Sequence, residues 1–203
     1  MKALLLALPL LLCAGCLSSP ARKAYLVEYE PAAAAPAKAG APAIRVGPFL
    51  AAEPYGAARM LVRDESNGRL HGTKGAELST PPAVALRNSV RRALAASGRY
   101  ASVLDADLPG ARGGESLSGF VEAARLERRA NGAHVYVLSA TFRHRGAADG
   151  AVPASFSLRS EKPAAGAKPE QQAAAARAAF ADLSERLVDR LSAGAAPAPA
   201  ARP

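Results

Sequence analysis

Two long alternating segments joined by an Asn-Gly dipeptide restrict the fold of this chain more than any other feature. Residues 117–128 and 133–145 flank Asn131-Gly132, which favours a tight hairpin turn because it accepts positive φ. In the second segment one face is apolar, formed by Tyr136, Leu138, Ala140 and Phe142. Residues 152–158 continue the alternation. The sequence therefore predicts an antiparallel meander of three strands.

Shorter strands are predicted before and after the first helix. Residues 23–29 are rich in β-branched and aromatic side chains, and residues 44–49 form a second strand closed by Gly47-Pro48. Residues 59–63 and 69–73 bracket Ser66-Asn67-Gly68, a second hairpin turn. Two or three strands are thus expected before the helix, and residues 100–104 form a short strand after it.

Two helices complete an α+β pattern. Ser79 or Thr80 caps the first, Pro81 or Pro82 occupies its first turn and Gly98 ends it. Its apolar stripe is Ala83, Leu86, Val90, Ala93, Leu94 and Ser97, with Arg87, Arg91 and Arg92 facing outward. The second helix spans residues 169–192 and ends before Gly194, with an apolar face of Ala173, Ala176, Phe180, Leu183, Leu187 and Leu191. We predict one α+β domain, residues 23–192, with an antiparallel or mixed sheet and two packed helices.

Alanine limits the size of the core. The 203 residues include 51 alanines, no Trp, five Phe and five Tyr, so the chain can bury one modest core of about 130 ordered residues. Residues 31–43 are mostly Ala and Pro and are predicted to be a loop, and residues 193–203 are predicted to be a disordered tail. Two large domains are excluded.

The net charge of +9 is spread along the chain. The Arg-Arg pairs are Arg91-Arg92 and Arg128-Arg129, and no basic run reaches five residues, so the sequence has no basic stretch typical of a nucleic-acid-binding module. We expect no nucleic-acid partner.

The N-terminus predicts export and a lipid anchor. Met1-Lys2 is a short positive segment, residues 3–12 are apolar, and Cys13-Ala14-Gly15-Cys16 is a small-residue cleavage site. The apolar run is shorter than the roughly 20 residues that span a bilayer. Small residues before a cysteine resemble the bacterial lipobox, which predicts a leader of residues 1–15, lipidation of Cys16 with fatty acids such as palmitate, and a tether of residues 16–22. The alternative is an ordinary signal peptide cut near Ala14, with Cys16 a free thiol.

Cleavage before Cys16 leaves no second cysteine for a disulfide or a metal site, because Cys13 departs with the leader. Leu17 follows Cys16, in place of the aspartate that resembles an inner-membrane retention signal. The expected location is the periplasmic face of the outer membrane.

No catalytic constellation is evident. His71, His134 and His144 lack metal-ligand spacing, and the last two fall at the two ends of one strand. Residues 115–119 lack the first glycine of a hydrolase elbow, and Gly113-Gly114 and Asn67-Gly68-Arg69 match no phosphate-binding loop. No spacing selects an acid/base pair among Asp105, Asp107, Glu115, Glu122 and Glu127. We therefore expect no catalytic residue, cofactor or metal, and no enzyme.

The order of these features resembles the ABC-type transport auxiliary lipoprotein family over residues 16–192. The segments that carry the likeness are the lipobox cysteine and residues 25–27, 44–48, 58–63, 76–78, 97–100 and 117–121. The resemblance implies a non-enzymatic subunit on the outer membrane that works with an ABC permease and an MCE-type protein in lipid or hydrophobic-solute traffic between membranes. It also implies that the chain can form a homo-oligomer.

Two alternatives stay open. The first is an envelope-assembly or structural lipoprotein that docks a secretion or polysaccharide machine. The second is a lipid carrier in its own right, which needs a cavity that the small core disfavours.

Overall fold

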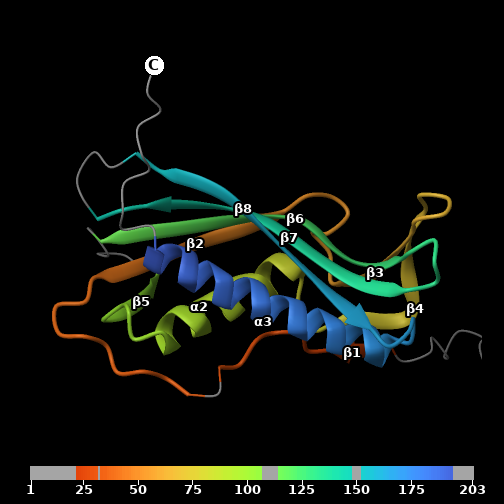
Figure 1. Cartoon of the computed structure of the whole chain (residues 1–203), viewed down its shortest axis with the longest axis horizontal. Helices are drawn as coiled ribbons and strands as arrows, with labels where there is room; N and C mark the ends of the chain where they lie inside the picture. The colour runs from red at the N-terminus through yellow and green to blue at the C-terminus, as the bar shows by residue number, and fades with distance from the viewer. Residues whose placement is uncertain (1–21, 32, 107–113, 148–151, 194–203) are drawn as a thin grey trace, which may run out of the picture.

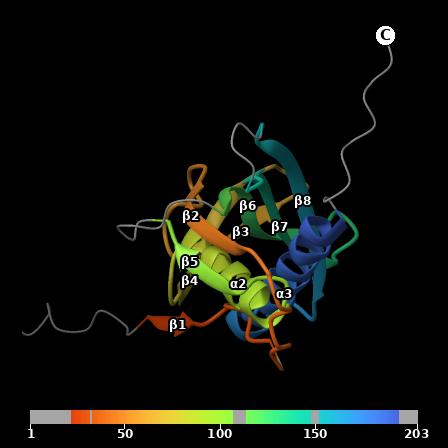
Figure 2. The ribbon, with the colours of Figure 1, turned by 90° about the vertical axis from the view of Figure 1, so that its left-hand side faces the viewer.

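A single mixed sheet wraps around two helices. The structure is a computed structural model that describes residues 22–31, 33–106, 114–147 and 152–193, and it contains an eight-stranded sheet with both helices against one face (Figures 1 and 2). The predicted α+β class, mixed sheet and single domain are confirmed. The predicted leader and the tail beyond residue 193 lie outside the described residues. Within the described ranges, no helix combines the length and apolar character needed to cross a membrane.

Ten elements follow one another along the described chain. They are β1 Lys23–Tyr25, β2 Ala43–Ala51, β3 Arg59–Asp64, β4 Leu70–Leu78, α2 Pro82–Ala96, β5 Ser102–Asp105, β6 Glu115–Arg128, β7 His134–Arg145, β8 Ala154–Ala164 and α3 Pro169–Ala193. Four strands precede α2, where the sequence predicted two or three. The Ala/Pro-rich segment contains no helix or strand over residues 33–42, as expected.

Strand β6 is the centre of the sheet. It pairs antiparallel with β7 through a turn in which Gly132 has φ of 82°, and β7 pairs antiparallel with β8, which confirms the predicted meander. The other edge of β6 is shared by two parallel neighbours, β2 along its first half and β3 along its second. Strand β4 pairs antiparallel with β3, and the short edge strands β1 and β5 pair parallel with β4 and β2. The parallel pairs make the sheet mixed.

Several strand boundaries differ from the sequence predictions, and β4 and β8 continue to Leu78 and Ala164. The first strand ends at Tyr25 because the chain then crosses to α2, where the Tyr29 amide donates a hydrogen bond to Ser89 Oγ at 2.9 Å. Gly47-Pro48 does not close β2, since a bulge between Val46 and Phe49 absorbs the irregularity and pairing with β6 resumes. Val152 precedes β8 and is 87% exposed, so it does not join the alternating face.

Helix α2 begins without the side-chain cap that the sequence suggested. Its N-cap residue is Pro81, which makes no side-chain capping bond, and the Thr80 hydroxyl lies 3.5 Å from the Glu28 carboxylate instead. The C-terminal prediction is confirmed, because Gly98 has φ of 64° and a Cβ at this position would lie 2.6 Å from the Pro36 carbonyl oxygen. Glycine is therefore required there by both conformation and space.

The core lies between the sheet and the two helices. All six predicted apolar residues of α3 are buried, as are the predicted residues of α2 except Ser97, which is half-buried. From the sheet, Tyr136, Leu138, Ala140 and Phe142 of β7 face the same core and are buried as predicted. The alanines of α3 bring this helix close to the sheet, which suits a chain with few large side chains.

Candidate functional site

The predicted lipidation residue, Cys16, lies outside the described residues. Strand β1 begins at Lys23, seven residues after Cys16. Because a chain extends by at most about 3.5 Å per residue, these seven residues span at most about 25 Å. An anchor at Cys16 would therefore hold β1 close to a bilayer surface.

The three histidines lie apart on the sheet. His71 is exposed on β4, His134 begins β7 and His144 lies near the end of the same strand. Among the described residues, no group of three or more His, Cys, Asp or Glu could hold a metal ion. The serines of residues 115–119 lie within β6, so they do not occupy a strand-to-helix elbow.

The carboxylates singled out in the sequence have separate partners. Asp107 lies outside the described residues. The others contact cations or donors from neighbouring elements: Asp105 with Arg87 and Arg91, Glu122 with Thr141, Glu127 with Arg125 and Arg129, and Glu115 with Tyr100 and His144. No two of these four described carboxylates are brought together as an acid/base pair by the contacts that the structure shows.

One polar cluster joins β6, β7 and the segment before β5, and sequence spacing did not reveal it. Glu115 Oε2 accepts a hydrogen bond from the Tyr100 hydroxyl at 2.9 Å and lies 2.9 Å from His144 Nε2, while Arg99 Nε donates to the Tyr100 oxygen at 3.0 Å. Burial, and then the nearby Glu115 charge, raise the pKa of Tyr100 to about 12. The hydrogen bond from His144 holds the pKa of Glu115 below its ordinary 4.5. The cluster ties one end of the sheet together.

Glu115→Gln is expected to lower the free energy of unfolding at pH 7 by about 1 to 2 kcal/mol, because the charged acceptor of two hydrogen bonds is lost. The pKa of Glu115 is depressed in the folded state, so its stabilisation is present above pH 4.5 and is lost as the pH falls through the folded pKa. Urea unfolding at several pH values from 7 to 3.5 should show the difference between variant and parent shrinking with acidity. Tyr100→Phe, which leaves His144 in place, should show a smaller effect in the same window. A difference independent of pH would contradict this role.

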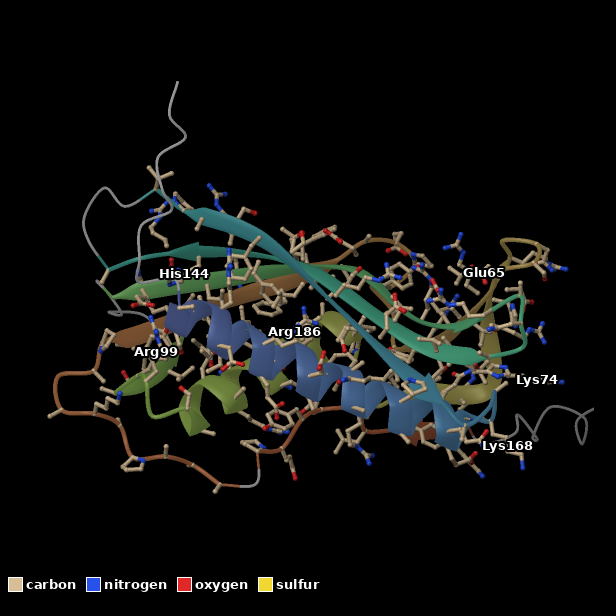
Figure 3. All side chains as sticks on the ribbon, in the orientation of Figure 1. Glu65, Lys74, Arg99, His144, Lys168 and Arg186 are labelled. Carbon is tan, nitrogen blue, oxygen red and sulfur yellow. The ribbon has the colours of Figure 1, made fainter. Side chains whose placement is uncertain are left out.

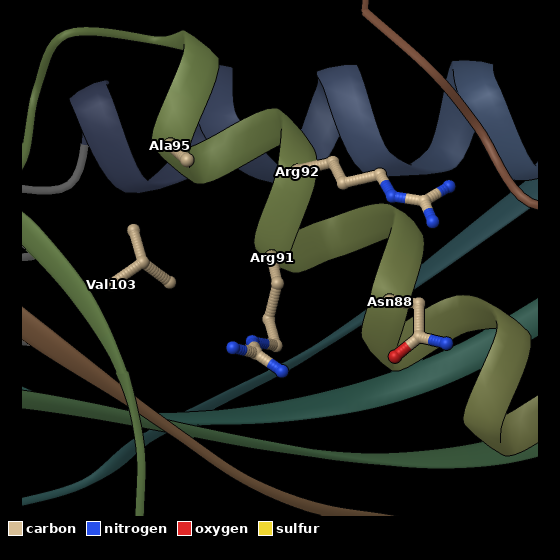
Figure 4. Close-up of a pocket in the computed structure, with 5 residues that line it drawn as sticks. All are labelled: Asn88, Arg91, Arg92, Ala95 and Val103. Atoms are coloured by element: carbon tan, nitrogen blue, oxygen red, sulfur yellow. The ribbon is translucent and has the colours of Figure 1, made fainter.

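A hollow of about 390 Å³ beside α2 is lined by Asn88, Arg91, Arg92, Ala95 and Val103, and its two arginine side chains diverge (Figure 4). Arg92 pairs with Glu28 at 3.0 Å, and Arg91 pairs with Asp105 at 3.2 Å. A carboxylate therefore neutralises each guanidinium, and the two ion pairs connect α2 to its neighbours. The hollow does not present uncompensated positive charge to a ligand.

A second hollow, of about 240 Å³, opens on the face of the sheet away from the helices. Most of the side chains that line it are small, and two are arginines. The lining residues are Gly47, Ala106, Ser116, Leu117, Ser118, Arg143, Arg145 and Pro153. Arg143 and Arg145 alternate with Phe142, which is fully buried on the helix side, so they project from the opposite face. This hollow gathers uncompensated cations within the described chain, since neither arginine pairs there with a carboxylate.

The fold defines a class of small α+β domains in which one mixed sheet covers two helices. A solved structure with this fold is protein XCC0632 from Xanthomonas campestris, of family DUF330, with a TM-score of 0.71 and 22% identity over 82% of this chain and 92% of that one. An uncharacterized protein has a TM-score of 0.60 and 11% identity, over 83% and 99% of the two chains. A PelC dodecamer from Paraburkholderia phytofirmans gives a TM-score of 0.41 with 19% identity, over 74% and 91%. No family model and no curated protein matches this sequence.

Proposed function

We propose that this protein is a lipoprotein anchored through Cys16 to the periplasmic face of the outer membrane, where it acts as a non-enzymatic auxiliary subunit of an ABC/MCE-type transport system for lipids or hydrophobic solutes. The observation that carries the proposal is the small-residue motif that ends at Cys16, seven residues before the first strand of a single small domain. The role in a transport system is inferred from the resemblance of residues 16–192 to the auxiliary lipoproteins.

The polar chemistry of the described domain supports a binding role in preference to catalysis. The carboxylates that could act as acids or bases are engaged by arginines, hydroxyls or an imidazole, and the histidines lie on separate parts of the sheet. Such side chains hold strands and helices together. We therefore place the function on the exposed surface of the domain. A surface that binds other subunits is what an auxiliary component needs.

Co-purification tests this function. The protein carrying a C-terminal tag is isolated from detergent-solubilised envelopes, and its companions are identified by mass spectrometry, with an equally tagged unrelated lipoprotein as control. We expect an ABC permease and an MCE-type protein to be enriched over the control. Enrichment of a secretion or polysaccharide apparatus would contradict the transport role and favour envelope assembly, and recovery of bound lipid with no permease would favour a carrier.

A further inference from the structure

The helix-free face of the sheet carries a patch that combines cations with apolar side chains. We call it the distal patch and define it by three cross-strand rows on β2, β6 and β7. Ser116 pairs with Arg145 and Ser118 with Arg143 between β6 and β7, and Leu50 pairs with Phe120 between β2 and β6. Directly paired side chains on one face of a sheet are neighbours, so the arginines and the apolar pair belong to one continuous surface.

The charge of the distal patch is available to a ligand. Arg143 and Arg145 are both exposed and have no carboxylate partner among the described residues, whereas Arg91 and Arg92 of α2 are each compensated. The hydroxyls of Ser116 and Ser118 lie on the opposing strand beside the hollow. Guanidinium groups bind carboxylates with paired hydrogen bonds, so two of them beside a hollow recognise anionic groups.

The apolar part of the distal patch is unusual for an exposed sheet face. Leu50 is 62% exposed and Phe120 is 42% exposed, although the two residues pair directly between β2 and β6. Large apolar side chains that stand next to arginines are characteristic of protein-binding surfaces, where aromatic and aliphatic anchors are enclosed by a polar rim. The partner must therefore offer both negative charge and apolar side chains.

The position of the distal patch selects the kind of partner. The described chain begins at β1, toward one end of the long axis, while the last residues of β7 lie at the other end (Figure 1). Figure 3 places Lys74 and Lys168 at the β1 end and His144, between the two patch arginines in the sequence, at the opposite end. Strand β6 alone has 14 residues, about 45 Å at 3.3 Å per residue. The patch thus lies far from the segment that leads to the anchor.

We propose that the distal patch docks an acidic, partly apolar segment of a periplasmic partner protein, whose carboxylates bind Arg143 and Arg145 and whose apolar side chains cover Leu50 and Phe120. This inference rests on the proposed function for its partner, because it assigns the contact through which the auxiliary subunit joins its transport system. A protein segment fits better than a lipid surface, since the arginines flank a hollow of side-chain size and lie away from the anchored end.

Photo-crosslinking from the distal patch tests the proposal. Benzoyl-phenylalanine replaces Phe120 in the full-length protein, which retains an aromatic ring at this position, and intact envelopes are irradiated. The same group at Val84 of α2, which is 43% exposed against 42% for Phe120, is the matched control. We expect a discrete product from position 120 and not from position 84, with the crosslinked peptide of the partner rich in Asp or Glu.

Charge reversal gives the test its specificity. Arg143→Glu with Arg145→Glu should reduce the crosslinked product about tenfold or more, because like charges repel across the contact. Arg59→Glu with Arg69→Glu changes the net charge equally at exposed arginines outside the patch and should leave the product unchanged. A product with lipid or with a second copy of this chain, a product insensitive to charge reversal, or no product would each overturn the inference.

The two proposals fail in different ways. If the permease and MCE-type protein co-purify but position 120 gives no charge-dependent product, the docking inference is wrong and the proposed function stands. If position 120 crosslinks to an acidic segment of a secretion or polysaccharide protein, the distal patch is a docking site and the transport function is wrong.

Discussion

Cys16→Ala is expected to move the protein from the membrane pellet to the soluble periplasmic fraction. Each acyl methylene buried in the bilayer contributes about 0.8 kcal/mol, so several fatty acyl chains hold the domain firmly and their loss removes the anchor. The variant is expressed behind a leader with an ordinary signal-peptidase site, so that export does not depend on the cysteine. Fractionation of cells and labelling with radioactive palmitate provide the measurement.

Cys13→Ala is the matched control for this experiment, because Cys13 belongs to the predicted leader and is three residues from Cys16. This variant should stay in the outer-membrane fraction and incorporate palmitate. If the Cys16 variant still sedimented with the outer membrane, the lipid anchor would be wrong. If the parent protein were itself soluble and took up no palmitate, cleavage near Ala14 with Cys16 as a free thiol would be the better account.

Phe142→Ala is expected to lower the free energy of unfolding by about 3 to 5 kcal/mol. Phe142 is fully buried, and its ring centroid lies 5.8 Å from that of Phe49 on β2 and 5.9 Å from that of Phe156 on β8. The substitution leaves a cavity between strands and also removes two aromatic contacts. Domains of this size are stable by only about 5 to 15 kcal/mol, so the variant should approach global unfolding at room temperature.

Urea denaturation measures this effect in the soluble Cys16→Ala background, with and without Phe142→Ala. Phe120→Ala is the control, because it makes the same chemical change on the adjacent strand at a position that is 42% exposed. It should cost less than about 1 kcal/mol, since the side chain is already partly in water. Equal effects at the two positions would contradict the assignment of Phe142 to the core and of Phe120 to the open face.

Much of the fold could be predicted from local patterns. Both Asn-Gly turns, the meander that follows residue 115, the C-terminal end of α2 at Gly98 and the buried face of α3 are confirmed. These features depend on backbone preferences and on the periodicity of apolar side chains, which act over a few residues. The lipidation of Cys16 and the absence of catalysis stay predictions.

Other features depend on contacts between distant segments. The first strand ends at Tyr25 because Glu28 and Tyr29 find partners on α2. Thr80 does not cap that helix because the N-cap position falls on Pro81, and the Thr80 hydroxyl donates to Glu28. Sequence spacing did not distinguish Glu115 from four other carboxylates. The pairing of β6 with β7 places His144 beside it. No local pattern encodes these partners.

The sequence by itself determined the turns and the helix faces, because these follow from residue type and short-range periodicity. Tertiary structure decided that β2 and β3 share one edge of β6, which carboxylates pair with Arg91 and Arg92, and that Arg143, Arg145, Leu50 and Phe120 share one open surface. The physical reason is that register between strands far apart in the chain sets which side chains meet, and register is fixed only when the whole core packs.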